Sequence, residues 1–118
     1  MVKSDNDIVN SFNEERKQLN ALVLKYGGPV TKRFFSLDTQ AYQNGALPAK
    51  TKELIGLVAS LVLRCDDCIK YHLNQCHQND VSTPEMVEAI ETGLIVGGSI
   101  TIPHIRRAFK YWEALIKK

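Results

Sequence analysis

Apolar side chains recur three and four residues apart along nearly the whole chain, and glycine or proline interrupts this spacing at intervals. Such spacing places apolar side chains on one face of an α-helix, whereas a half-buried strand alternates every two residues. The first such segment runs from Ile8 to Tyr26 and stops at Gly27-Gly28, which is a typical helix end. No segment shows strand-like alternation, so the sequence predicts an all-α protein.

Five further helices are expected from the same spacing and its interruptions. Their bounds are Pro29 to Asn44-Gly45, Pro48 to about Val62, the cysteine-bearing segment to Asn79-Asp80, Ser82 to Gly97-Gly98, and Thr101 to Ile116. Ser82 and Glu85 have the spacing of a capping box, which marks a helix start. The helix that follows Pro48 is apolar nearly all round, so we expect its own domain or a partner subunit to surround it.

The size and charge of the chain exclude several classes of protein. Its 118 residues, 44% of them hydrophobic, suit one domain with a real core. A net charge of +2 is too mild to indicate nucleic-acid binding. The longest apolar run, Leu54 to Leu63, is far shorter than the roughly 20 residues that a bilayer requires. We therefore expect neither a nucleic acid nor a membrane as partner.

The cysteines suggest a cytoplasmic protein. The chain has three cysteines within twelve residues, an odd number that does not resemble the disulfide framework of a secreted domain. The first residues are polar and lack the apolar stretch of a secretion signal. In the cytoplasm a CxxC pair is typically catalytic or metal-binding.

Cys65, Cys68 and His72 form the segment with the clearest chemistry. If the segment is helical, these three residues lie on one face of the helix. A close thiol pair can cycle between dithiol and disulfide. A histidine four residues beyond a cysteine can lower the pKa of the thiol when charged, or take its proton when neutral.

Glu53 has two interpretations. It lies near the start of the apolar helix that precedes the cysteines, so burial could raise its pKa toward the range of a general base. Alternatively, it could be a first-turn glutamate that complements the helix dipole, which is common.

The cysteines also have more than one interpretation. They could be buried residues without a chemical role, or Cys65, Cys68, His72 and Cys76 could bind zinc. On one straight helix these four residues span about 16 Å at 1.5 Å each, which is too far for a single tetrahedral site. We therefore favour a redox pair and expect no metal. The sequence has no glycine-rich phosphate loop and no dinucleotide fingerprint, so we also expect no cofactor.

Cys68 is our expected nucleophile and Cys65 the resolving thiol. A helix N-terminus would favour a thiolate at Cys65, whereas Cys68 has His72 as a direct neighbour one turn later. Asp66 and Asp67 add negative charge that opposes a thiolate at either cysteine. Elsewhere we expect a buried spectator at Cys76, a surface residue at His77, and a structural or exposed histidine at His104.

The combination of Glu53, Cys65-x-x-Cys68 and His72 resembles the alkylhydroperoxidase D-like, or carboxymuconolactone decarboxylase, superfamily. The similarity covers roughly residues 30–117, and it includes Leu47-Pro48, Lys52-Glu53-Leu54, Gly97-Gly98 and the segment 102–108. One departure concerns Asp67, because members of the alkylhydroperoxidase D group typically have histidine just before the second cysteine. This departure weakens the proton relay that the resemblance implies for Glu53 and His72.

The apolar spacing leads us to expect one domain over residues 1–118, with an N-terminal helix in 1–28 and the core in 30–117. The resemblance implies the same all-α fold, assembled as trimers or hexamers. It also implies a thiol-dependent antioxidant activity on a hydroperoxide or a protein disulfide, with a reducing dithiol as partner. By this analogy Glu53 and His72 form a proton relay, Cys68 meets the substrate, and Cys65 closes an intramolecular disulfide.

Two alternatives stay open at this point. The protein could be a lactone or decarboxylation enzyme of the same fold, with His72 or His104 as the acid–base group. It could also be a zinc-stabilised interaction module without enzymatic activity.

Overall fold

The computed structural model describes residues 5–117, which form six α-helices and one short 3-10 helix. The elements are α1 (Asp5–Tyr26), α2 (Pro29–Ala41), α3 (Ala49–Val62), α4 (Asp66–Gln78), α5 (Thr83–Gly97), η1 (Ser99–Thr101) and α6 (Ile102–Ile116). No strand occurs in this described part of the chain. The predicted all-α fold of about six helices is therefore confirmed.

Residues that break or cap helices set most of these bounds. Pro29 occupies the first turn of α2, where its missing N–H costs no hydrogen bond. The backbone N–H of Glu85 donates to Ser82 Oγ over 3.2 Å, and the N–H of Ser82 donates to Glu85 Oε1 over 2.8 Å. The predicted capping box at the start of α5 is thus confirmed.

The end of α2 differs from the prediction. The helix ends at Ala41 rather than at Asn44-Gly45, and a loop leads from there to α3. Asn44 Oδ1 accepts a hydrogen bond of 2.6 Å from the backbone N–H of Ala49, the first residue of α3. The residue that we expected to end one helix therefore stabilises the start of the next.

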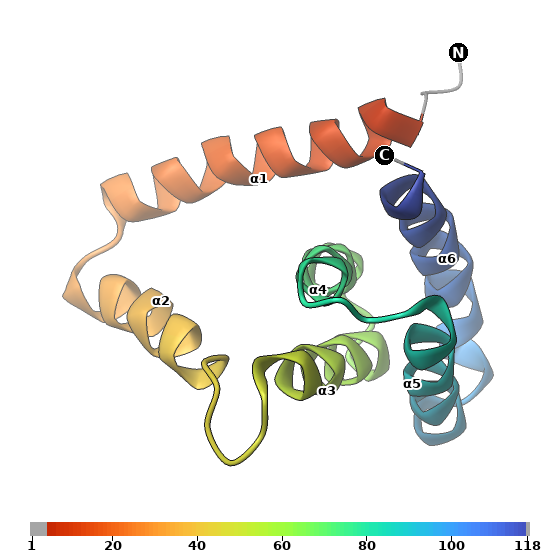
Figure 1. Cartoon of the computed structure of the whole chain (residues 1–118). Coiled ribbons are helices and arrows are strands. Elements are labelled where there is room, and N and C mark those ends of the chain that lie inside the picture. The colour runs from red at the N-terminus through yellow and green to blue at the C-terminus, as the bar shows by residue number, and fades with distance from the viewer. Residues whose placement is uncertain (1–4, 118) are drawn as a thin grey trace.

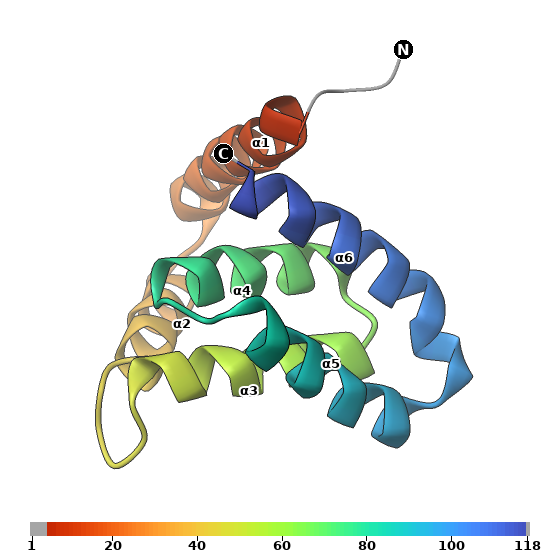
Figure 2. The same cartoon turned by 45° about the vertical axis from the view of Figure 1, so that its right-hand side comes forward.

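Helix α4 lies between α3 and α6, and α5 and α1 pack against these two helices in turn (Figures 1 and 2). Helix α5 packs against α3, and the first half of α1 crosses the C-terminal part of α6. The buried core is made of apolar side chains from α1, α3, α4, α5 and α6, among them Val9, Leu57, Leu73, Ile90 and Trp112. This arrangement places the start of α4 beside α3.

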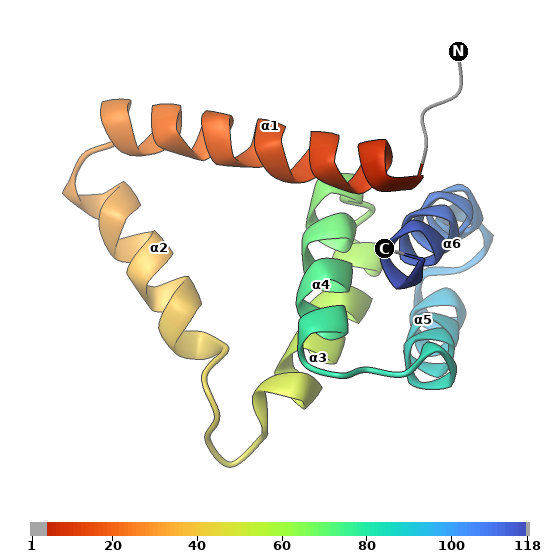
Figure 3. The same ribbon diagram turned by 45° about the horizontal axis from the view of Figure 1, so that its top comes forward.

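Helix α2 stands apart from the other helices, joined to α1 at one end and to α3 at the other (Figure 3). None of its residues is buried. The second half of α1 and α2 expose a series of large apolar side chains, namely Leu19, Leu22, Val23, Leu24, Tyr26, Val30, Phe34 and Leu37. No helix in residues 5–117 is long and apolar enough to cross a membrane.

The expectation for the apolar helix α3 is met on one side only. Helices α4 and α5 pack against α3 and bury Leu57 and Leu61 completely. Ile55 on the same helix is about half exposed, at 53%, and Leu63 just beyond its end is 77% exposed. Within one chain, α3 therefore keeps an uncovered apolar side.

Candidate active site

Glu53 on α3 and His72 on α4 form a buried pair. Their side chains meet through a hydrogen bond of 2.9 Å between Glu53 Oε1 and His72 Nδ1, and the two residues are only 4% and 8% exposed. Since a carboxylate can only accept, His72 donates from Nδ1, and in the neutral ring Nε2 keeps its lone pair. Glu53 is the fifth residue of α3. Of its two interpretations, burial is correct and a first-turn dipole partner is wrong.

A glycine and a tyrosine frame the His72 ring. A Cβ atom on Gly56 would lie 2.6 Å from His72 Cε1 and 2.7 Å from the hydroxyl oxygen of Tyr42. Only glycine therefore lets both rings approach α3 this closely. The Tyr42 hydroxyl lies 3.5 Å from His72 Nε2, and the two ring centroids are 5.3 Å apart. Tyr42 follows the last residue of α2, so it links that helix to the site.

Cys65 and Cys68 are joined by a disulfide bond, with their Cα atoms 5.2 Å apart. Cys65 was expected inside the helix, but its backbone is extended and it is the N-cap of α4. Its Sγ accepts the backbone N–H of Cys68 over 3.2 Å. Cys65 is half-buried, whereas Cys68 is exposed. The structure thus brings the predicted thiol pair together and leaves one sulfur open to solvent.

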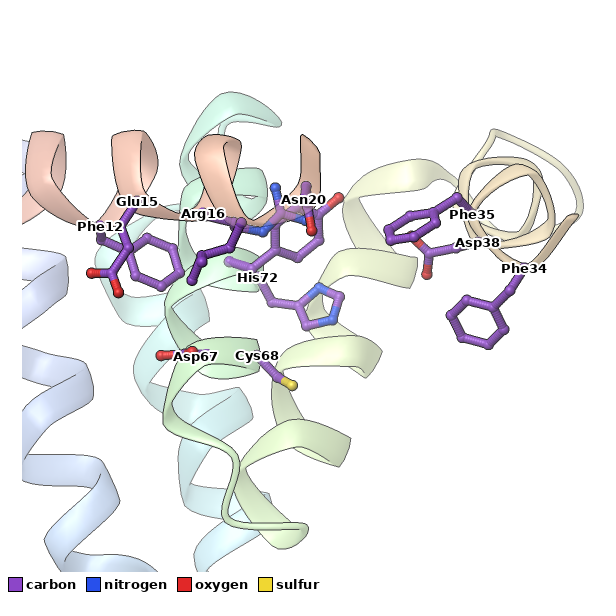
Figure 4. A pocket seen from close by; sticks show the side chains of 12 residues that line it. Phe12, Glu15, Arg16, Asn20, Phe34, Phe35, Asp38, Asp67, Cys68 and His72 are labelled. Carbon is purple, nitrogen blue, oxygen red and sulfur yellow. The ribbon is translucent and has the colours of Figure 1, made fainter. Parts of the chain in front are cut away.

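Cys68 and His72 line a common cavity of about 420 Å³ between α1, α2 and α4. Figure 4 shows both side chains projecting from the same side of α4, with Phe34, Phe35 and Asp38 of α2 across the space from them. The remaining lining residues are Phe12, Glu15, Arg16, Leu19, Asn20, Asp67 and Tyr71. The cavity therefore has room for a small organic molecule beside Cys68.

The structure also shows how the possible zinc ligands are arranged. Cys65 and Cys68 are bonded to each other, and Nδ1 of His72 is hydrogen-bonded to Glu53. Within residues 5–117, no group of three or more histidine, cysteine, aspartate and glutamate side chains is placed to hold a metal ion. The geometry therefore gives the zinc interpretation no support.

Comparison with known proteins identifies the family. Residues 29–112 match the model of the carboxymuconolactone decarboxylase family. The chain belongs to this family. A Cupriavidus necator protein described as uncharacterised is 31% identical over 109 residues, which are 92% of this chain and 96% of that protein.

Solved structures of carboxymuconolactone decarboxylase family proteins share the fold. Two crystal structures of a Thermotoga maritima protein are 55% and 54% identical to this chain, with TM-scores of 0.89 and 0.87. Each similarity covers 91% of this chain, and it covers 94% of the first Thermotoga maritima chain and 91% of the second. The second is described as a family member with a suggested part in an antioxidative response. A Legionella pneumophila family member is similar in fold, with a TM-score of 0.83 at 24% identity, covering 91% of this chain and 96% of its own.

The Asp66 carboxylate has partners that sequence analysis did not identify. Asp66 was expected to oppose a thiolate, but its carboxylate accepts hydrogen bonds of 2.7 Å from His104 Nδ1 and 2.8 Å from Arg107 Nε. Partial burial would raise the pKa of Asp66, but the two hydrogen bonds and the nearby charges outweigh it and lower the pKa below its ordinary value. The effect of Asp66 and Asp67 on a thiolate stays a prediction.

The other cysteine and histidines lie away from the cavity of this family member. Cys76 is fully buried, and burial raises the pKa of its thiol to about 12, with a smaller contribution from the Glu53 charge. It therefore stays protonated, as suits the predicted spectator. His77 is exposed, as predicted, and lies edge-on to Trp112. His104 is half-buried, and its Nδ1 pairs with Asp66.

Sequence reasoning missed Tyr42, Gly56 and the α1–α2 wall of the cavity. Gly56 carried a signal, because it lies three residues after Glu53 on the same helix face, and a glycine inside a strongly apolar helix often marks a close approach. Tyr42 lies at the end of α2, and the helical spacing that places it on one face of α2 does not show that this face meets His72. Arg16 is exposed and Asp38 is half-buried, and sequence alone does not place such polar residues at a cavity.

Proposed function

We propose that the protein is a thiol-dependent antioxidant oxidoreductase that reduces hydroperoxides by cycling Cys65 and Cys68 between dithiol and disulfide. The observation that carries the proposal is the exposed Cys68 sulfur, which is bonded to Cys65 and lines the same cavity as His72. The antioxidative role suggested for the Thermotoga maritima relative supports it. A protein disulfide could be reduced by the same pair of thiols.

In the first step His72 takes the proton of the Cys68 thiol, with Glu53 holding the ring through Nδ1. The thiolate then attacks one peroxide oxygen, the O–O bond breaks, and Cys68 becomes a sulfenic acid. The alkoxide that leaves takes the proton back from His72 and departs as the alcohol. Sulfur is oxidised by two electrons and the hydroperoxide is reduced by two.

In the second step the Cys65 thiol attacks the sulfenic sulfur of Cys68. An S–S bond forms, the S–O bond breaks, and the hydroxyl leaves with the Cys65 proton as water. The Cα separation of 5.2 Å between the two cysteines, within the usual range for a disulfide, supports this step. The product is the disulfide form of the protein.

In the third step an external dithiol restores the protein. One of its thiolates attacks the exposed Cys68 sulfur, and Cys65 leaves as a thiolate. The N-cap position suits this leaving group, because the Cys68 N–H points at Cys65 Sγ and the helix N-terminus favours negative charge. The second thiol of the partner then attacks the partner sulfur that is bonded to Cys68. Cys68 leaves as a thiolate, and the partner departs as a disulfide. In total, two protons and two electrons have passed from the partner to the protein. A cytoplasmic location would suit this step, since thiols are kept reduced there.

Cysteine variants test the proposal. Cys68→Ser should abolish the consumption of cumene hydroperoxide in the presence of a dithiol, because no nucleophile remains. Cys65→Ser should accumulate a sulfenic acid at Cys68, detectable with dimedone and mass spectrometry. In the wild type, one equivalent of peroxide should remove two free thiols, mapped to Cys65 and Cys68. Full activity in both single variants would contradict the proposal.

A further inference from the structure

The cavity that reaches Cys68 is far larger than hydrogen peroxide. Its volume of about 420 Å³ lies within the range of pockets that bind small organic molecules, roughly 300–1,000 Å³. Phe12 and Leu19 of α1 and Phe34 and Phe35 of α2 contribute apolar lining. These side chains can remove an apolar substrate group from water, which is favourable in proportion to the area buried.

The charged side chains of the cavity are mostly acidic. Glu15, Asp38 and Asp67 line it with carboxylates, and Arg16 is the cation among its lining residues. The guanidinium of Arg16 lies over the Tyr71 ring, 4.1 Å from the ring centroid, so an aromatic face occupies one side of this cation. The lining therefore carries about two more negative than positive charges.

Of the three carboxylates that line the cavity, Asp38 lies across from Cys68 and His72 (Figure 4). It projects from α2 into the space between α2 and α4, toward which Cys68 and His72 also project (Figure 4). Burial raises the pKa of Tyr42 and Tyr71, and the charges of Glu53 and Asp38 raise both further, while Arg16 partly lowers that of Tyr71. The field of Asp38 thus extends to the side chains that surround His72.

We propose, building on the hydroperoxide reductase function above, that this cavity selects uncharged or cationic organic substrates with an apolar part and rejects anionic ones, with Asp38 as the main specificity-determining residue. Charges that line a concave site with apolar walls act on a ligand more strongly than charges on an open surface. An anionic substrate must approach the Cys68 sulfur against this field, whereas a cationic one is attracted.

Charged thiol reagents test this selectivity without requiring turnover. In the reduced Cys65→Ser variant, Cys68 is modified with the cationic trimethylammonioethyl and the anionic sulfonatoethyl methanethiosulfonate, and each rate is divided by that for free cysteine. We expect the cationic-to-anionic ratio to exceed that of free cysteine about fivefold at low salt, and to fall as salt screens the charges. Mass spectrometry confirms that Cys68 is the residue modified.

Matched charge variants identify the residue responsible. Adding Asp38→Asn to the Cys65→Ser variant should lower the cationic-to-anionic ratio of modification rates about threefold. Glu15→Gln provides a second cavity variant if Asp38→Asn folds poorly. Glu88→Gln on the exposed face of α5 changes the net charge equally but lies outside the cavity, so it should leave the ratio unchanged. The proposal would be overturned if the two reagents had equal rates after division by those for free cysteine. Equal effects of Asp38→Asn and Glu88→Gln on the cationic-to-anionic ratio would also overturn it.

Substrate pairs extend the test to turnover. Cumene hydroperoxide should have a kcat/KM about fivefold above that of its para-carboxylated derivative in the wild type, and Asp38→Asn should reduce this difference. Equal values would overturn the selectivity. If neither hydroperoxide is consumed while the thiol reagents still discriminate by charge, the proposed function fails and the selectivity of the cavity stands.

Discussion

At the scale of single residues, Gly56 controls how closely His72 and Tyr42 approach α3. Gly56→Ala would place a Cβ atom 2.6 Å from His72 Cε1, so the ring must shift and its contact with Glu53 must loosen. We expect a loss of about 1–3 kcal/mol in the free energy of unfolding and a fall of roughly tenfold or more in peroxide turnover, because misplaced catalytic groups lose rate steeply. Urea denaturation and a coupled peroxide assay measure the two effects.

Gly28→Ala is the matched control for this substitution. Nothing lies within 4 Å of a Cβ atom at Gly28, and its φ of −92° suits any residue. Its turnover should equal that of the wild type. Full activity and unchanged stability in Gly56→Ala would contradict the close approach described for the His72 ring.

Cys76 provides a second test at this scale. Burial raises the pKa of its thiol to about 12, so almost no thiolate exists at pH 8, and the side chain is inaccessible. Iodoacetamide at pH 8 should alkylate Cys68 in the reduced native protein and leave Cys76 intact, and urea should expose Cys76 to the reagent. Rapid native alkylation of Cys76, measured by peptide mass spectrometry, would contradict its burial.

Some contacts of the site were predictable from single residues, and others were not. Glu53 and His72 could be proposed as partners only through the resemblance to the family, because the sequence pattern alone left Glu53 with two interpretations. The pairing of Asp66 with His104 and Arg107 spans about 40 positions, and no local pattern specifies a contact over that distance. The partners of Asp66 were therefore not predicted.

At the scale of helices, Asp66 ties the start of α4 to α6. Its hydrogen bonds lower its pKa in the folded state, so the unfolded chain binds this proton more readily. The contribution to stability is present above the unfolded-state pKa of about 3.9 and is lost as pH falls through the folded-state value. Asp66→Asn should thus lower the urea midpoint at pH 7 and have a smaller effect at pH 2.5.

Asp67→Asn is the control for this pH dependence, since Asp67 is the exposed neighbour of Asp66. It should change the urea midpoint little at either pH. The contact between α4 and α6 would be assigned incorrectly if Asp66→Asn were as stable as the wild type at pH 7.

The capping box of α5 allows a second prediction for helices. The Ser82 N–H is the largest cause that lowers the pKa of Glu85 to about 2, followed by Lys50, whose Nζ lies 3.0 Å from Glu85 Oε1. Ser82→Ala should cost about 1 kcal/mol in the free energy of unfolding, as is typical for the loss of an N-cap. Ser36→Ala, at a hydroxyl that binds exposed Gln40 within α2, should be nearly neutral. Thermal denaturation compares the two variants, and equal melting temperatures would contradict the cap.

Helices were predictable where a local signal marks them. Proline, paired glycines and the capping box act within a few residues, so the starts of α2 and α5 and the end of α1 agree with the sequence. The end of α2 did not, because Asn44 hydrogen-bonds forward to α3. Cys65 was placed inside a helix, but it caps α4 with an extended backbone. A cap and a first-turn residue look alike in sequence.

At the scale of the molecule, we predict that the chains associate. Large apolar side chains are exposed along the second half of α1 and along α2, with Val30 and Phe34 at 78% and 67%, and such contiguous surfaces mark interfaces. Sedimentation velocity should give a mass above the 13.3 kDa of one chain, and Val30→Ser with Phe34→Ser should lower it. The control variant Glu88→Ser with Glu91→Ser, at two exposed positions of α5, should leave the mass unchanged. A strictly monomeric wild type would contradict the prediction.

Helix α2 supplies Phe34, Phe35 and Asp38 to the cavity and brings Tyr42 to His72, yet it buries none of its own residues. A helix that buries none of its residues within its own chain needs contacts from outside the chain to hold its position. If neighbouring copies provide that support, catalysis follows mass action. Turnover per chain should then decline on dilution below the concentration at which copies separate.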